Sequence, residues 1–175
     1  MIYSHLSDVG AGNEKGSGVA FSFAFDGGFM LRTSDEKWRL GLSVQNIGPN
    51  VVYVDAAQAD PLPRNLKLGF AYMPVDDAYN RLTLAYDADK ELVGVKDHLH
   101  TELFEIKHHF GVEYVYSNLL SLRAGWYQDD EGQISTPMFG AGILLKDINV
   151  DLSYIPNSEK VTISGTTRIS IGYRF

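Results

Sequence analysis

Histidines that lie close together in sequence are the first residues that could build a chemical site. His98, His100, His108 and His109 form this group, and histidines two residues apart share one face of a strand, where they could bind a metal ion. No repeated carboxylates accompany them to complete a ligand set. We therefore interpret the group as part of a polar loop and expect no metal site.

Acidic residues gather at two other places. Asp76 and Asp77 form a pair, and residues 129–132 have the sequence Asp-Asp-Glu-Gly. Carboxylates bind calcium, but neither place has the twelve-residue spacing of an EF-hand loop. Because Asp and Gly are frequent in turns, we interpret both places as turns.

Catalytic signatures are missing from the sequence. The chain has no Cys, which excludes thiol nucleophiles, thiolate zinc sites and disulfides. Ser and His occur without Gly-x-Ser-x-Gly or another nucleophile motif. We expect no enzyme activity, no catalytic residues and no cofactor.

The composition favours one β-rich domain over residues 1–175. The net charge is −7 and the sequence has no basic run, so nucleic acid is not expected as a partner. The 17 Gly, 10 Tyr and 9 Phe suit strands joined by many turns. No apolar run is long enough for a transmembrane helix, but strands of a transmembrane β-barrel need only alternate apolar positions.

Apolar residues alternate with polar or small ones through most of the chain, which predicts strands with one apolar face. Nine strands are expected, at 19–31, 37–47, 65–73, 80–87, 108–116, 120–128, 135–145, 148–155 and 166–175. Residues 2–7 resemble the end of a further strand. The pattern therefore predicts an all-β, antiparallel up-and-down sheet.

The expected connections alternate in length along the chain. The short ones are 32–36, 74–79, 117–119 and 146–147, and the longer ones are 8–18, 48–64, 88–107, 129–134 and 156–165. Outer-membrane barrels have short turns on the periplasmic side and long loops outside the cell. The alternation of short and long connections favours such a barrel, with the C-terminus on the side of the short turns.

Turn lengths also predict which residues face each other. A three-residue turn at 117–119 places Glu113 opposite Arg123, a favourable pair of opposite charges. The two-residue turn at 146–147 places Ile143 opposite Val150 and Phe139 opposite Tyr154. These registers keep the apolar positions of neighbouring strands on one face.

The two faces of the predicted sheet suit two different environments. In a membrane barrel the apolar face contacts lipid and the charged face lines the lumen, whereas a soluble, lipocalin-like binding module has the apolar face inside. Aromatic residues near strand ends favour the membrane, since they form interfacial girdles: Tyr72, Tyr86, Tyr116, Trp126, Tyr154 and Tyr173. The lumen-facing candidates are Arg39, Lys67, Glu113, Arg123, Asp151, Arg168 and Arg174.

The last strand carries apolar residues at every second position and ends in an aromatic residue. Ile169, Ile171, Tyr173 and Phe175 make up this pattern, which resembles the C-terminal assembly signal of bacterial outer-membrane proteins. The resemblance implies recognition by the barrel-assembly machinery.

A series of segments resembles the PorV/PorQ family of outer-membrane proteins, which is related in fold to the FadL fatty-acid channels. The segments are 25–28 (FDGG), 38–49 (WRLGLSVQNIGP), 62–72 (LPRNLKLGFAY), 111–114 (GVEY) and 120–126 (LSLRAGW). Such barrels are expected to have about fourteen strands and a signal peptide. The resemblance therefore implies that this chain is the C-terminal part of a larger barrel.

The resemblance also implies a location and partners. We expect the bacterial outer membrane, with contacts to its lipid and transport or type IX secretion as the function. Secreted cargo proteins or a hydrophobic small molecule are the expected passengers. Two alternatives stay open: a soluble lipocalin-like module, and a purely structural outer-membrane anchor.

Overall fold

The computed structural model describes residues 2–5, 19–51, 61–92, 105–157 and 165–174, and the elements in these ranges are all strands. A nine-stranded antiparallel sheet dominates, in the order β11-β10-β9-β8-β7-β6-β5-β4-β3. Each strand pairs with its neighbours along the chain, so the sheet is an up-and-down meander. The prediction of an all-β, antiparallel up-and-down fold is confirmed. The strands of this sheet are β3 (Phe25–Arg32), β4 (Trp38–Ile47), β5 (Asn65–Asp76), β6 (Asn80–Glu91), β7 (Ile106–Tyr116), β8 (Leu120–Asp129), β9 (Ile134–Leu145), β10 (Ile148–Ile155) and β11 (Thr166–Tyr173).

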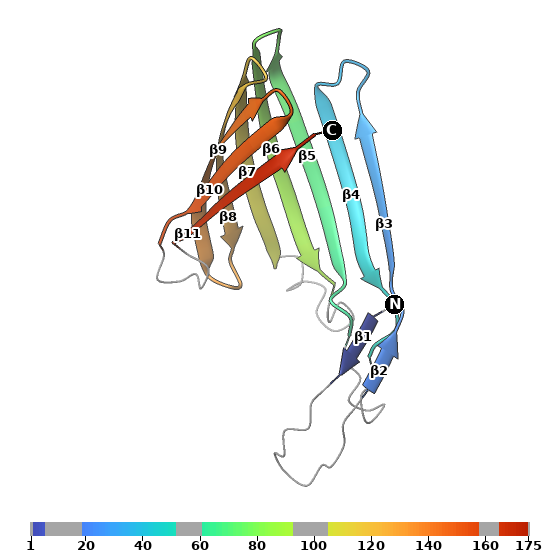
Figure 1. The fold of residues 1–175 in the computed structure, drawn as a ribbon. Coiled ribbons are helices and arrows are strands. Elements are labelled where there is room, and N and C mark those ends of the chain that lie inside the picture. Colours follow the sequence, from blue (N-terminus) through green and yellow to red (C-terminus); the bar gives the residue numbers. More distant parts are fainter. Residues whose placement is uncertain (1, 6–18, 52–60, 93–104, 158–164, 175) are drawn as a thin grey trace.

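The strand predicted over residues 19–31 is divided in two. Strand β2 (Val19–Ser22) pairs with β1 (Ile2–His5) in a separate two-stranded sheet, and β3 begins after Phe23 and Ala24. A single straight strand was therefore the wrong prediction. The break places β2 beyond the end of the main sheet (Figure 1), and the close approach of Gly48 to the Phe23 carbonyl holds this bend.

The predicted registers are confirmed in all three cases. Glu113 faces Arg123 across β7 and β8. Ile143 faces Val150, and Phe139 faces Tyr154, across β9 and β10. The two-residue and three-residue turns thus fix the registers as their lengths require.

Several strands are longer than the apolar alternation predicted. Strand β5 continues through Asp76, β6 continues through Glu91, β8 reaches Asp129, and β7 begins at Ile106. The added residues are largely polar, and they pair across strands through their charges, as Lys67 does with Asp89 at 2.8 Å. The connections 74–79, 88–107 and 129–134 shrink to 77–79, 92–105 and 130–133.

The sheet is strongly curled, so the strands form a trough rather than a flat layer (Figure 1). The short turns after β3, β5, β7 and β9 lie at one end of the trough, where β11 also ends. The strands joined by the longer connections meet at the opposite end, which we call the long-loop end. Strands β3 and β11 are the two edges of this sheet within the described residues. Closure of the sheet into a barrel stays a prediction.

Burial is inverted relative to a soluble β protein. The apolar side chains of the main sheet form its outer face and are widely exposed, as at Phe110 (50%), Leu122 (50%) and Ile171 (75%). Within the described residues, the buried apolar side chains are Val51, Leu62 and Met73. The sheet therefore has no conventional apolar core. The described part of the chain contains no helix that could span a membrane.

Candidate functional site

The inner face of the trough carries the polar residues of alternate strand positions, and we call it the polar face. Its side chains reach across neighbouring strands because the curl brings them together. Arg123 in β8 donates from Nη1 to Asp151 Oδ1 in β10 at 2.6 Å, although β9 lies between these strands. A hollow lined by residues from Arg81 in β6 to Arg174 after β11 lies on this side, which identifies the polar face as the concave one.

A three-residue ion bridge crosses the polar face. Arg123 Nε donates to Glu113 Oε2 at 2.5 Å, and Nη1 donates to Asp151 as described above. Asn149 Nδ2 adds a 3.0 Å hydrogen bond to Asp151 Oδ2. Gly142 in β9 makes room for the bridge, since a Cβ there would meet Asp151 Oδ1 and lie 2.5 Å from Ser121 Oγ. The bridge ties β7, β8 and β10 together through three predicted residues and passes over β9.

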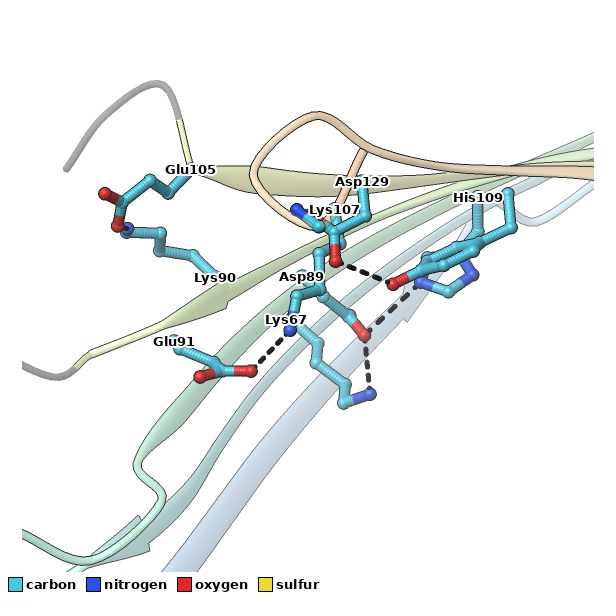
Figure 2. A network of polar contacts seen from close by, with 10 residues as sticks. Lys67, Asp89, Lys90, Glu91, Glu105, Lys107, His109 and Asp129 are labelled. Carbon is cyan, nitrogen blue, oxygen red and sulfur yellow. Dashed lines mark hydrogen bonds and ion pairs between the residues drawn. The ribbon is translucent and has the colours of Figure 1, made fainter. Parts of the chain in front are cut away.

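A second polar network lies nearer the long-loop end (Figure 2). Asp89 accepts a 2.8 Å hydrogen bond from Lys67 Nζ, and its Oδ2 lies 3.5 Å from His109 Nε2. Lys107 Nζ pairs with Glu91 Oε1 at 2.5 Å. Tyr127 and Asp129 continue the network, with the hydroxyl donating to Asp129 Oδ2 at 3.3 Å. Positive and negative groups alternate, so most charges are neutralised within the face.

A hollow of about 500 Å³ opens beside this network. Its lining combines three glycines with charged or polar and with apolar residues: Gly28, Gly41, Gly69, Ser43, Lys67, Asp87, Asp89, His109, Phe29, Met30 and Leu42. Because charged, small and apolar residues share this lining, the hollow does not select between polar and apolar ligands. Within the described ranges, no group of three or more His, Cys, Asp or Glu side chains could hold a metal ion.

The remaining lumen-facing candidates lie on the same face, and Arg174 shares a hollow with the bridge residues Glu113, Arg123 and Asp151. Arg39 Nη2 is 4.0 Å from Glu36 Oε2. Arg168 is opposite Ser153 in the register. Arg174 lines a hollow of about 400 Å³ near the short turns. Whether this face bounds a lumen stays a prediction for all seven candidates.

The sequence interpretation missed Asp89, Glu91 and Lys107, which it assigned to a loop. It also counted His108 and His109 with a polar loop, whereas both lie within β7. A usable signal existed, because the acidic residues continue at every second position after Asp87. Apolar alternation ends there, so a search for apolar strands stops too early. The opposite charges on β5 and β7 identify the partners once the register is known.

The histidines of the group that the structure describes lie on opposite faces of the sheet. His98 and His100 lie outside the described residues. His108 is on the apolar side and shares a 2.8 Å hydrogen bond with the Tyr86 hydroxyl, whereas His109 is on the polar face. Adjacent strand positions point to opposite faces, so these two rings do not converge on one ion.

The acidic turns behave as turn chemistry predicts. Asp77 Oδ1 accepts backbone hydrogen bonds from Tyr79 and Asn80, each at 2.8 Å. These donors hold the pKa of the Asp77 carboxyl below its usual range. Asp129 Oδ1 accepts a 2.9 Å bond from the Gly132 amide. The turn interpretation is confirmed for Asp77 and for residues 130–132. It was wrong for Asp76 and Asp129, which are the last residues of β5 and β8.

The terminal strand presents its alternating residues on the outer face. Ile169, Ile171 and Tyr173 are each about two-thirds or more exposed. Phe175 lies outside the described residues. The role of this strand as an assembly signal stays a prediction.

Comparison with known proteins gives one family. The model of the family described as type IX secretion system protein PorV matches residues 10–98, which is just over half of the chain. No curated protein matches the chain. The matched range includes β2 to β6 and therefore four of the nine strands of the curled sheet.

Proposed function

The chain belongs to the PorV family of type IX secretion system proteins, and from that premise we propose that it works in the bacterial outer membrane in the transfer of passenger proteins. In this proposal the outer face of the trough contacts lipid, and the polar face lines an aqueous interior. The observation that carries the proposal is the inverted burial, with apolar residues outside and paired charges inside.

The dimensions of the strands support a membrane location. Strands β4 to β9 contain between 10 and 12 residues. Ten residues at about 3.4 Å each span about 34 Å, which a tilt of about 40° reduces to about 26 Å. The apolar band of outer-membrane barrels is about 25 Å tall.

Aromatic and charged side chains support the two borders of this band. Near the short turns, Trp38 stacks on Tyr72 with 3.9 Å between ring centroids. Toward the long-loop end, Phe110 faces both Tyr86 and Trp126 in the register. Aromatic rings are enriched where the membrane meets water. The apolar face is therefore framed by rings on both sides.

The position of Lys90 supports a border of the apolar band at the long-loop end. Lys90 follows Tyr86 on the outer face, and its Nζ lies 3.2 Å from Glu105 Oε2. A charged pair is unfavourable in hydrocarbon but stable in the interfacial region. We therefore propose that the border of the hydrocarbon region crosses β6 between Tyr86 and Lys90.

The family relationship supports secretion rather than solute uptake. PorV proteins are secretion-system components and not a known enzyme family. We therefore propose passenger proteins as the transferred molecules and the long-loop end as the outward side.

A deletion strain tests the proposal in a bacterium that secretes through the type IX route. Passenger proteins should be lost from the cell surface and medium and accumulate inside the outer membrane. The chain should fractionate with the outer membrane, and a plasmid copy should restore release. A protein exported by a different route is the control against leakage. Normal passenger release without the gene would refute the proposed function.

A further inference from the structure

The connection between β4 and β5 starts and ends in a compact cluster at the long-loop end. We call it the clamp and define it as residues 46–51 and 62–64. Val51 and Leu62 are buried there and pack against Ala24. In the part of the chain that the structure describes, this is the apolar cluster that resembles the interior of a soluble protein. The outer-face pattern of the sheet does not explain it.

Arg64 is the central polar residue of the clamp. Its Nη2 donates to the Gly48 carbonyl at 2.9 Å and to Asn50 Oδ1 at 2.8 Å. Its own carbonyl accepts a 2.8 Å bond from the Leu92 amide, which follows β6. Arg64 therefore connects the beginning of the connection to its end and to the neighbouring strand.

Asn46 makes a second link between the two sides. Its side-chain Nδ2 donates to the Pro63 carbonyl at 2.9 Å, and its backbone N–H donates to Asp26 Oδ1 at 2.7 Å. Asn46 has a positive φ of 58°, a conformation that Asn tolerates better than most residues. This local conformation turns the chain out of β4 toward the clamp.

The clamp also fixes the bend between β2 and β3. Gly48 approaches the Phe23 carbonyl so closely that a Cβ would overlap it, and that Cβ would lie 2.9 Å from Leu62 Cδ1. Ser22 Oγ donates to the Pro49 carbonyl at 3.2 Å. The clamp thus orders the junctions of five strands, β2 to β6.

Such a clamp exceeds what is needed to join two strands. Strands β5 and β6 are joined by three residues without a buried apolar cluster of their own. Ordering the ends of a longer connection costs conformational entropy, which burial of Val51 and Leu62 offsets. A defined loop base is useful when a partner must be contacted in one geometry.

We propose that Arg64 is a positioning residue for passenger transfer, acting through the clamp. It holds the base of the β4–β5 connection in the arrangement that the passenger protein contacts. This inference rests on the proposed function, and it assigns a role to the end of segment 38–49 and the start of segment 62–72, which carry the family resemblance. Barrel assembly should not depend on Arg64, because Arg64 lies outside the paired strands and only Asn46 and Ile47 of the clamp belong to one.

A buried thiol reports the state of the clamp. Val51→Cys introduces a lone thiol at a position that is 9% exposed, and the natural chain has no Cys. Labelling by a polar maleimide should be slow in this variant. Adding Arg64→Ala should accelerate it by about tenfold or more, since both charge-assisted hydrogen bonds are lost. Arg81→Ala is the matched control, because Arg81 pairs with Asp76 at the other end of the sheet.

The secretion test uses the full chain in the natural host. Arg64→Ala should lower passenger release at least several-fold while the amount of folded protein in the outer membrane stays normal. Arg64→Lys should restore part of the release, and Arg81→Ala should leave it unchanged. If Arg64→Ala fails to fold, Asn50→Ala removes a single acceptor and should give the same pattern more weakly.

Two results would overturn the inference. If Arg64→Ala and Asn50→Ala leave the labelling rate of the Val51→Cys thiol unchanged, Arg64 does not hold the clamp. Faster labelling with normal passenger release would make the clamp purely structural. Neither result contradicts the proposed function, which fails only if deletion of the whole gene leaves the release of passenger proteins intact.

Discussion

Arginine placed at two neighbouring positions of β6 should have very different costs. Leu84 is 44% exposed on the outer face, between Tyr72 and Val112 in the register. Thr83 is on the polar face opposite Glu113 and lines a hollow of about 360 Å³. The two substitutions add the same side chain to the same strand, so they differ mainly in the face that receives the charge.

The depth of Leu84 sets the expected magnitude. It lies four residues from the start of β6 at Asn80, which is about 14 Å along the strand and about 10 Å along the membrane normal at a tilt of about 40°. This is close to the middle of an apolar band about 25 Å tall, where a lipid-facing Arg costs about 2–4 kcal/mol. Arg at Thr83 has room and an acidic neighbour, so its effect should stay within about 1 kcal/mol.

Equilibrium unfolding in lipid vesicles measures this difference. The two Trp residues of the chain provide the fluorescence signal, and urea titrations give the free energy of unfolding for the wild type, Leu84→Arg and Thr83→Arg. Leu84→Arg should be less stable than Thr83→Arg by about 2–4 kcal/mol. Equal losses at the two positions, or a larger loss at Thr83, would refute the assignment of the outer face to lipid.

Three further predictions concern topology, packing and assembly. A Cys at Gln58 should react with an impermeant reagent on intact cells and one at Asn118 should not; reversed labelling would invert the topology. Gly142→Ala should destabilise the fold by about 1–3 kcal/mol because the methyl group meets the Arg123–Asp151 bridge, whereas Gly41→Ala, which has open space, should be nearly neutral in the same urea titration. Deletion of Phe175 should lower the folded protein in the outer membrane of cells but leave refolding into detergent nearly normal; a parallel loss in both assays would mean that the residue is structural.

Much of the sheet could be predicted because period-two alternation is a local property. A strand such as β7 shows its two faces in consecutive residues, and a turn of known length fixes its register with the next strand. The pairing of Glu113 with Arg123 follows from that arithmetic alone. The ends of strands were less predictable, since beyond Asp87 charged residues replace the apolar ones and pairing partners come from distant segments.

The candidate site was predicted only in part for the same reason. Glu113 and Arg123 face each other on adjacent strands, but the contact of Arg123 with Asp151 passes over β9. That contact requires the curl of the sheet and the missing side chain at Gly142. The two-residue turn already places Gly142 opposite Asp151. The curl of the sheet is not contained in any spacing of the sequence, because it arises from all the strands together.

The sequence by itself determined the two faces, the order of the strands and the sorting of short and long connections, because these depend on residue spacing. The tertiary structure decided which face is concave, how charges from non-adjacent strands neutralise each other, and where β2 bends away from β3. Alternation defines two faces without giving the sign of curvature, which results from the twist and packing of all nine strands. The clamp around Arg64 likewise needs segments from residues 22 to 92 to meet, and only the folded chain brings them together.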